Sequence, residues 1–222
     1  MNEERENLKR LRKMFQAAFA ERMNVYGFDR RGGGMYYRKT DFGRKGVMIL
    51  DNIRLGTLQV SANMAVTLTD VEAALFEYRT KIRGDKDENK PNIQTVSKNL
   101  GNIKIGMYRY WNNYNDEDIA ETIDSIEVLV RDYGLAFLET VDTPEKVLKE
   151  ILETTRRKTK LGHPTYWWEK GFVLMMLLKR RDLFDEYLPI FDKRVENTST
   201  VMSDYVRFRD WIKSNQRWNE VS

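Results

Sequence analysis

Between residues 4 and 24, apolar side chains recur at every third or fourth position. Lysine and arginine residues lie between them, and the apolar set is Leu8, Leu11, Phe15, Ala18, Phe19 and Met23. Because an α-helix turns once in about 3.6 residues, this spacing gathers the apolar side chains on one face. The pattern therefore predicts an amphipathic helix that packs against a core.

A different period follows Gly27. Residues 35–39 and 47–50 are rich in aromatic and apolar side chains, and residues 58–66 largely alternate between apolar and polar. In this last segment the apolar set is Leu58, Val60, Ala62, Met64 and Val66, whereas Gln59, Ser61 and Asn63 point the other way. A period of two is typical of a strand with one covered face. Three strands joined by short connections predict an antiparallel meander.

A second helix is expected directly after this meander. Thr69 and Glu72 have the spacing of a capping box, in which two side chains satisfy free backbone amides at a helix start. The apolar stripe of this helix would be Val71, Ala74, Leu75, Tyr78 and Ile82. We expect the helix to cover the sheet, and the polar residues 84–91 to form an exposed loop.

The middle of the chain predicts two more strands and a helix. Residues 93–96 and 103–111 have the composition of short strands. Asp116 then begins a helix whose apolar face ends at Tyr133, and Gly134 is the expected stop. The acidic group at residues 116–118 lies where negative charge favours a helix start, so capping explains it better than a cation site does.

The last third of the chain is predicted to be helical. Residues 135–138 would form a short apolar connection, and residues 143–152 a helix that opens with Thr-Pro. Three further helices are expected at 166–181, 183–195 and 203–213. The fold class is therefore α+β: a mostly antiparallel sheet packed by helices, followed by an all-helical C-terminal region.

We place the boundary between these two parts near residue 155. Residues 1–155 would form the α+β domain, and residues 156–222 a helical extension packed on it. A chain of 222 residues accommodates either one domain or two small ones.

Composition narrows the possible chemistry. The chain has no cysteine and one histidine, His163, so disulfides, thiolate nucleophiles and the usual zinc sites are not expected. We expect neither a cofactor nor a metal. The longest apolar run, residues 172–178, is too short to span a bilayer, and residues 1–6 lack the apolar stretch of a secretory signal. A cytoplasmic location follows as the expectation.

The net charge alone does not distinguish between a nucleic acid and a protein as the partner. The formal net charge is +4, but the 38 basic and 34 acidic residues are interspersed. A small excess of this kind permits either a nucleic acid or an acidic protein partner.

Glycine and arginine residues occur together at one place in the chain. Arg30 and Arg31 precede Gly32–Gly34, a combination that can bind phosphate through backbone amides and guanidinium groups. In known phosphate loops the glycines lead into a helix, whereas here a predicted strand follows. A hairpin turn is therefore the preferred interpretation.

Aromatic and basic residues interleave at 36–39 and 108–111. Such a pattern can stack bases and pair phosphates in single-stranded nucleic acid, but a strand would bury about half of these rings. Residues 166–168 are three consecutive aromatics that cannot all face inward on a helix, so at least one ring should reach the surface. Exposed aromatic and arginine side chains are typical protein-interface anchors. The residues that we nominate for partner binding are Arg30, Arg31, Tyr37, Arg38, Arg109, Trp111, Arg156, Arg157, Trp167 and Trp168.

The order of these features resembles a largely bacterial family of domains of unknown function, number forty-three-zero-four. The similarity covers roughly residues 8 to 155. Its motifs are Tyr26-Gly27-Phe28 with Tyr36-Tyr37-Arg38, the run from Leu58 into Asp70-Val71-Glu72, and Trp111 ahead of Tyr133 to Glu139. The resemblance implies an α+β fold and, more loosely, kinship with immunity-type proteins that block a toxin by occluding it.

We therefore expect a non-catalytic protein that binds another protein, of the kind that neutralises a toxin. The alternative is a module that binds single-stranded nucleic acid through its basic and aromatic residues. An enzyme that uses carboxylates alone, as glycoside hydrolases do, is a third hypothesis, although the sequence nominates no pair of acids for it.

Overall fold

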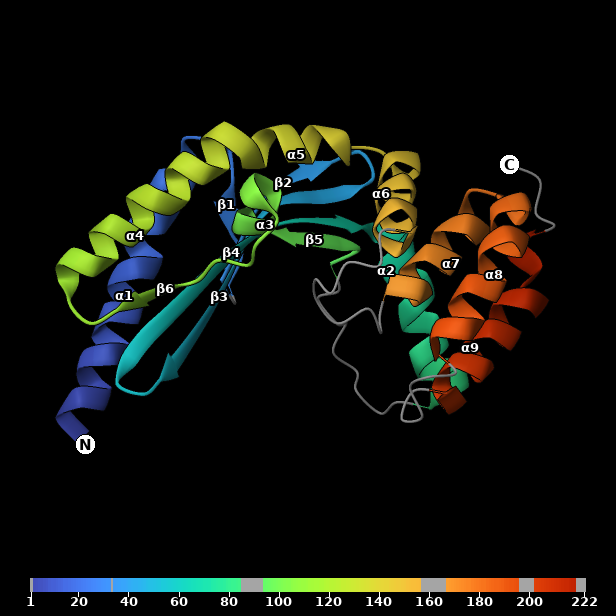
Figure 1. Ribbon diagram of the computed structural model, residues 1–222, viewed down its shortest axis with the longest axis horizontal. Coiled ribbons are helices and arrows are strands. Elements are labelled where there is room, and N and C mark those ends of the chain that lie inside the picture. Colours follow the sequence, from blue (N-terminus) through green and yellow to red (C-terminus); the bar gives the residue numbers. More distant parts are fainter. Residues whose placement is uncertain (1, 33, 85–93, 157–166, 196–201, 219–222) are drawn as a thin grey trace. The chain divides into compact units, whose positions relative to one another are not determined.

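The computed structural model describes residues 2–32, 34–84, 94–156, 167–195 and 202–218. Contacts between residues divide the chain into two compact units, and Figure 1 labels their elements. Unit 1 comprises Met1–Val66 and Ser97–Asp142, and unit 2 comprises Thr67–Val96 and Thr143–Ser222. The expected α+β fold class is confirmed, with the antiparallel sheet in the N-terminal half and helices in the C-terminal region.

These units differ from the division that we expected near residue 155. Residues 67–96 and 143–155, which the sequence pattern joined to the sheet, belong with the C-terminal helices by their contacts. The chain therefore crosses between the units three times rather than once.

Unit 1 contains most of the sheet. Its elements are α1 (Asn2–Asn24), β1 (Asp29–Arg30), β2 (Met35–Thr40), β3 (Gly43–Arg54), β4 (Thr57–Leu68), β5 (Val96–Asn99), α3 (Leu100–Ile105), β6 (Trp111–Asn113), α4 (Asp116–Leu129), the π-helical turn η2 (Val130–Gly134) and α5 (Leu135–Thr140). The strands follow the order β1-β2-β3-β4-β5, and β6 also pairs with β4. The ends of β4 and β5 cross into unit 2.

The predicted N-terminal helix is present, and its apolar stripe lies in the core. The ring of Phe19 stacks on Phe15 and meets the ring of Tyr36 from β2 edge-on, at 4.9 Å between centroids. On its outer side, Arg22 pairs with Glu127 of α4 at 2.7 Å. Apolar packing on one face and ion pairs beside it thus hold α1 against both the sheet and α4.

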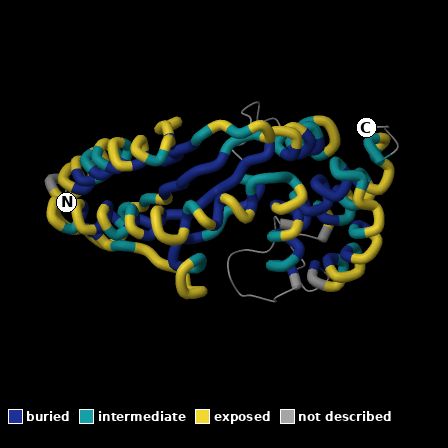
Figure 2. The backbone as a smooth tube through the Cα atoms, turned by 90° about the horizontal axis from the view of Figure 1, so that it is seen from above, coloured by how far each residue is buried: buried dark blue, intermediate teal, exposed yellow. Residues whose placement is uncertain are grey.

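Strand β4 is buried along nearly its whole length. Figure 2 shows long buried stretches of backbone, in dark blue, between exposed ones in yellow. We expected one covered face, but the polar side chains of Ser61 and Asn63 are also buried. The hydroxyl of Tyr108 donates to Ser61 Oγ at 2.8 Å, and Asn99 Nδ2 donates to Asn63 Oδ1 at 3.2 Å. The polar face is therefore covered by residues that return from farther along the chain, and hydrogen bonds replace the water that an open face would have.

Two predicted boundaries in unit 1 are wrong. Residues 103–105 belong to α3 rather than to a strand, because Asn99 caps a helix by accepting the amide of Gly101 at 2.9 Å. Strand β6 begins only at Trp111.

Gly134 does not stop the helix that starts at Asp116. It has helical backbone angles, and the chain continues through η2 into α5 over the residues that we expected to form a connection. A side chain at this position would meet the Sδ atom of Met64 at 2.7 Å. Glycine at this position lets η2 approach the side chain of Met64 in β4 closely, and it does not end the helix.

Unit 2 is helical. It contains α2 (Thr69–Glu77), the π-helical segment η1 (Tyr78–Arg83), α6 (Pro144–Arg156), α7 (Trp167–Leu177), α8 (Arg181–Val195), α9 (Met202–Ser214) and the 3-10 turn η4 (Gln216–Trp218). Helix α7 contacts α2, α6, α8 and α9, so it is the centre of this unit. This position explains the apolar run at 172–178, since a central helix is apolar on every side.

The predicted capping box at the start of α2 is wrong. Thr69 lies inside the first turn, and Leu68 is the N-cap residue without a side-chain cap. The chain enters α2 directly from β4, and the amide of Leu68 instead donates to the hydroxyl of Thr95 at 2.8 Å.

Among the described residues, no helix is both long and apolar enough to cross a membrane.

Candidate functional site

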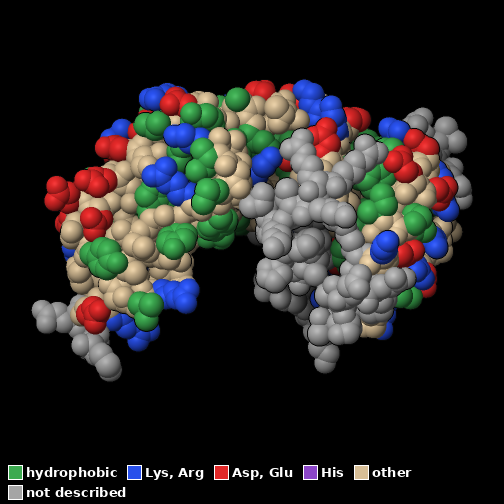
Figure 3. All heavy atoms as spheres, in the orientation of Figure 1, with side chains coloured by type: hydrophobic (Ala, Val, Ile, Leu, Met, Phe, Trp, Pro, Cys, Tyr) green, Lys and Arg blue, Asp and Glu red, His purple; other side chains and the backbone are tan. Residues whose placement is uncertain are grey.

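Exposed apolar side chains in unit 1 gather from the end of α3 to the residue after β6. Five of them lie within ten residues, each more than half exposed: Ile105, Met107, Tyr108, Tyr110 and Tyr114. We call residues 105–114 the aromatic segment. Figure 3 shows hydrophobic side chains, in green, gathered with lysine and arginine, in blue, over the region where Figure 1 places α3 and α4.

One buried asparagine holds the middle of the aromatic segment. Asn99 Oδ1 accepts the backbone amide of Arg109 at 2.8 Å, and its Nδ2 donates to the Arg109 carbonyl at 3.1 Å. The same Nδ2 lies 3.2 Å from the carbonyl oxygen of Ala62 in β4. A single side chain therefore ties the segment to the sheet as a neighbouring strand would.

Close packing of backbone adds to this restraint. A side chain at Gly101 would lie 2.4 Å from the carbonyl oxygen of Met107 and 2.6 Å from Cβ of Arg109. The segment therefore lies directly on the first turn of α3, where only glycine leaves room.

The end of the segment is held by a second buried asparagine. Asn113 Nδ2 donates to the carbonyl of Leu58 at 2.9 Å, and its Oδ1 accepts the hydroxyl of Thr122 at 2.7 Å. Three residues, Trp111 to Asn113, pair with β4. The exposed tyrosines thus project from backbone that is fixed on both sides.

Arg109 and Trp111 form a stacked pair on this surface. The guanidinium carbon of Arg109 lies 4.9 Å from the centre of the Trp111 ring. Both side chains reach Ser125 of α4, whose Oγ accepts from Arg109 Nη2 and from Trp111 Nε1 at 3.3 Å each. Stacking and shared hydrogen bonds orient the cation before any partner arrives.

Basic and acidic groups flank the aromatic segment. On one side, Lys104 Nζ lies 5.4 Å from the centre of the Tyr133 ring. On the other side, α4 opens with Asp116, Glu117 and Asp118. The hydrogen bond from Arg10 lowers the pKa of Asp116, so this carboxylate stays charged at neutral pH.

The acidic helix start is a cap, as expected. Asn115 accepts the amide of Asp118 at 2.9 Å, and the Asp118 carboxylate accepts the amide of Asn115 at 3.3 Å. Among the described residues, no group of three or more metal-ligating side chains comes together.

Among the described residues, the buried carboxylate belongs to Glu169 in unit 2 and not to the aromatic segment. Glu169 of α7 pairs with Arg79 of η1 at 3.3 Å, and burial raises its pKa in spite of that pair. A raised carboxyl pKa is typical both of structural ion pairs and of general acids, so it selects neither.

The nominated arginines of unit 1 have different neighbours. Arg109 and Trp111 lie together, whereas Arg30 donates to Gln16 of α1 at 2.7 Å and Arg31 pairs with Asp29 beside it. Arg38 pairs with Glu139 of α5 at 3.2 Å.

Two nominated rings are buried instead of presented. Tyr37 packs with Met35, Met48 and Ala65 on the sheet, and only 3% of its surface is exposed. Trp168 is equally buried, with its ring 4.9 Å from Tyr205 in the core of unit 2. Neither ring can contact a partner in this conformation. The side chains of Arg156, Arg157 and Trp167, and all of His163, lie outside the described residues.

Gly34, in the glycine run after Arg31, is part of the hairpin. Gly34 has a left-handed φ of 75°, and a side chain there would lie 2.4 Å from the carbonyl oxygen of Ile49. The amide of Ile49 donates to the carbonyl of Gly34 at 2.7 Å, so this close approach is part of the sheet. These contacts favour the turn over the phosphate site.

Sequence reasoning missed several parts of the site, among them Met107, Tyr114 and the pinning residue Asn99. Because residues 103–111 were predicted to form a strand, half of their rings were expected to be buried, and the exposed ones were not recognised as a group. The available signal was Asn99 followed by Leu100-Gly101, because asparagine is a preferred helix cap.

Comparison of the chain with protein-family models, with curated proteins and with solved structures found no match. The resemblance to the bacterial family of unknown function therefore stays a prediction.

Proposed function

We propose that this protein is non-catalytic and binds another protein through the aromatic segment, in the manner of an immunity-type protein that occludes a toxin. The observation that carries the proposal is the gathering of five exposed apolar side chains on backbone held by Asn99 and Asn113. Exposed apolar patches on a soluble surface are typical of binding sites. A fixed backbone also lowers the entropy cost of association.

The chemistry of the surface suits a protein partner. Tyrosine, methionine and arginine are enriched at the centres of protein interfaces, and all three occur in the aromatic segment. The basic residues Lys104 and Arg109 would meet acidic side chains of the partner, and the start of α4 would meet basic ones.

The test begins with affinity purification from the native host, followed by measurement of binding between the purified chain and the recovered protein. Tyr110→Ser should weaken that binding by about thirtyfold or more, which is the range of an interface hot spot. Phe42→Ser is the matched control, because Phe42 is an exposed aromatic at the β2–β3 turn of the same unit. Failure to recover a stoichiometric partner, together with failure to protect cells from toxins encoded by neighbouring genes, would contradict the proposal.

A second candidate function is binding of single-stranded nucleic acid. It is favoured by Arg109 stacked on Trp111 next to the exposed rings of Tyr108 and Tyr110, which could stack on bases. The acidic start of α4 counts against it, because phosphates would approach these carboxylates. Oligonucleotide binding that weakens steeply with salt and is lost in Arg109→Gln would replace the first proposal by this one.

A further inference from the structure

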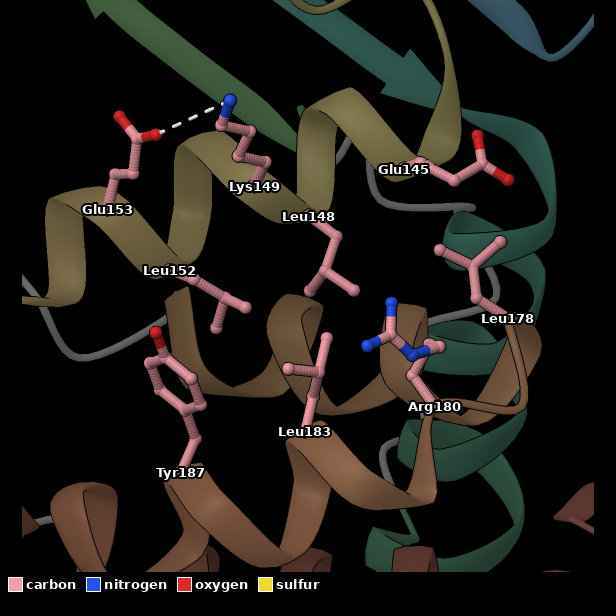
Figure 4. A pocket seen from close by; sticks show the side chains of 9 residues that line it. All are labelled: Glu145, Leu148, Lys149, Leu152, Glu153, Leu178, Arg180, Leu183 and Tyr187. Carbon is pink, nitrogen blue, oxygen red and sulfur yellow. Dashed lines mark ion pairs between the residues drawn. The ribbon is translucent and has the colours of Figure 1, made fainter.

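Unit 2 contains a pocket that the proposed binding surface does not use. It has a volume of about 550 Å³ and is lined by α6, the turn between α7 and α8, and α8, as Figure 4 shows. Its apolar lining is Leu148, Leu152, Leu178, Leu183 and Tyr187, and its charged lining is Glu145, Lys149, Glu153 and Arg180. Pockets of roughly 300 to 1,000 Å³ with mostly apolar walls are typical of small-molecule sites.

The walls follow from the spacing of residues on two helices. Leu148 and Leu152 are four apart on α6, and Leu183 and Tyr187 are four apart on α8, so each pair forms a row along its helix. Leu148, Leu152 and Tyr187 are buried, whereas Leu178 and Leu183 are half-buried. The two rows face each other in Figure 4 across an apolar trough with a partly open mouth.

The turn that joins α7 to α8 is held in an unfavourable conformation. Lys179 has a left-handed φ of 56°, although it is not a glycine. The amide of Arg180 donates to the carbonyl of Met175 at 2.8 Å, and that of Lys179 to Met176 at 3.2 Å, which closes a Schellman motif. Lys179 Nζ donates to the carbonyl of Arg217, which anchors the turn.

This turn places Arg180 at the mouth of the pocket. Its carbonyl accepts the amide of Phe184 at 3.1 Å, so Arg180 is the first residue to accept within α8. In Figure 4 its guanidinium extends between Leu148 and Leu183, whereas the carboxylates of Glu145 and Glu153 point away from the trough. The polar group offered to a ligand is therefore cationic.

A neighbouring carboxylate orients the guanidinium. Arg180 Nε donates to Oδ1 of Asp182 at 2.9 Å, and Nη2 donates to Oδ2 at 2.5 Å. The hydrogen bond from Arg180 lowers the pKa of Asp182 to about 2, so the pair persists over the neutral range. This two-point pair leaves Nη1 without a partner among the described residues.

We propose that this pocket binds a small amphiphile that has an anionic head group and an apolar tail. The head group accepts from Nη1 of Arg180, and the tail lies along the row of leucines towards Tyr187. A small anion without a tail would gain little, because Arg180 already shares its charge with Asp182. The tail supplies the remaining affinity by covering Leu178 and Leu183, the two apolar lining residues that are partly exposed.

The test uses dodecanoate, titrated calorimetrically into the full chain below its critical micelle concentration. One dodecanoate per chain should bind saturably, and dodecyltrimethylammonium, which has the same tail and the opposite charge, should bind at least about tenfold more weakly. Absence of saturable dodecanoate binding would overturn the proposal. Equal binding of the two amphiphiles would do so too, because it indicates non-specific adsorption.

Two matched variants locate the site. Arg180→Gln should weaken dodecanoate binding about tenfold. Arg181→Gln removes the same charge from the next residue, whose guanidinium lies over the rings of Phe184 and Trp218, and should change binding less than about twofold. Equal losses in the two variants would refute the assignment of Arg180.

A third variant tests the tail. Leu183→Trp fills the trough and should abolish binding of dodecanoate while the far-ultraviolet circular dichroism stays that of the parent chain. Unchanged binding in a folded Leu183→Trp chain would place the ligand elsewhere. If this variant does not fold, the comparison of Arg180→Gln with Arg181→Gln still decides, because both residues are exposed.

Discussion

Two stretches of unit 1 have nearly the same composition and opposite environments. Residues 36–38 read Tyr-Tyr-Arg and residues 108–110 read Tyr-Arg-Tyr. Both tyrosines of the first stretch are buried, whereas Tyr108 and Tyr110 are each 54% exposed. The difference teaches that exposure depends on what covers the backbone, because the residue types are the same.

The first stretch is a strand with material on both faces. Tyr36 lies against Phe19 of α1, and Tyr37 lies on the opposite face with Met35 and Met48. In the second stretch Asn99 binds the backbone of Arg109, and both rings are about half exposed, with the hydroxyl of Tyr108 donating to Ser61. The first pair of rings therefore stabilises the fold, and the second is available for binding.

The largest expected difference between the two stretches is in stability. Tyr36→Ala removes a fully buried ring and should lower the free energy of unfolding by about 3–5 kcal/mol. Tyr110→Ala should change it by less than about 0.5 kcal/mol, because that ring is more than half exposed. Chemical denaturation of both variants checks this, and similar losses would show that the aromatic segment is part of the core.

The second largest effect is expected where Asn99 holds the aromatic segment. Asn99→Ala leaves the amide and carbonyl of Arg109 without their buried partner, so we expect the free energy of unfolding to fall by about 2–3 kcal/mol. Hydrogen exchange of the Arg109 amide should accelerate along with it. Asn112→Ala is the control, since its bond to Gln59 is exposed and its loss should cost less than about 0.5 kcal/mol. Unchanged exchange at Arg109 in Asn99→Ala would contradict the assigned role.

Gly101 and Gly134 both pack closely, but Gly101 lies against rigid backbone and Gly134 against a flexible side chain. Gly101→Ala would press a methyl group on the carbonyl of Met107, which is backbone, and should cost about 1–3 kcal/mol. Gly134→Ala would meet the flexible side chain of Met64, and alanine also favours a helix, so the loss should be smaller. Thermal unfolding of both variants shows which one loses more stability. A larger loss for Gly134→Ala would contradict the expectation that the side chain of Met64 moves aside.

The smallest expected effect is a gain in stability. Leu55, at the β3–β4 turn, is 90% exposed and has a left-handed φ of 49°. Leu55→Asn should stabilise the protein by about 0.5–1 kcal/mol, because asparagine tolerates this conformation better than leucine. Leu55→Ala lacks the polar side chain through which asparagine hydrogen-bonds locally in this conformation, so it should give no such gain. A destabilised Leu55→Asn chain would mean that the exposed leucine makes a contact that outweighs its strain.

Periodic patterns in the sequence predicted the elements with strong amphipathic or alternating character. The stripe from Leu8 to Met23 predicted α1, and the alternation from Leu58 to Val66 predicted β4, because one face of each had to be apolar. The same reasoning failed where a helix cap or a long-range contact decided the structure instead of the period. Residues 103–105 became helical through the cap at Asn99, and Gly134 allowed close packing on Met64 rather than ending a helix.

The candidate site was predicted only in part, for the same reason. Arg109 and Trp111 were nominated because aromatic and basic residues interleave there, and they do lie on the aromatic segment. Tyr37 and Trp168 were nominated for similar aromatic runs, but both are buried. The pocket could not be predicted from spacing alone, since Leu148 and Leu183 come from helices far apart in the chain.

The sequence by itself determined the fold class, the amphipathic helices and the near absence of cysteine and histidine side chains. Residue type and local period decide these properties. Only the tertiary structure decided which aromatic rings face solvent, which asparagines are buried and which leucines line a pocket. These properties depend on partners distant in the chain, such as Asn99 for Arg109, and no local pattern of residues encodes them.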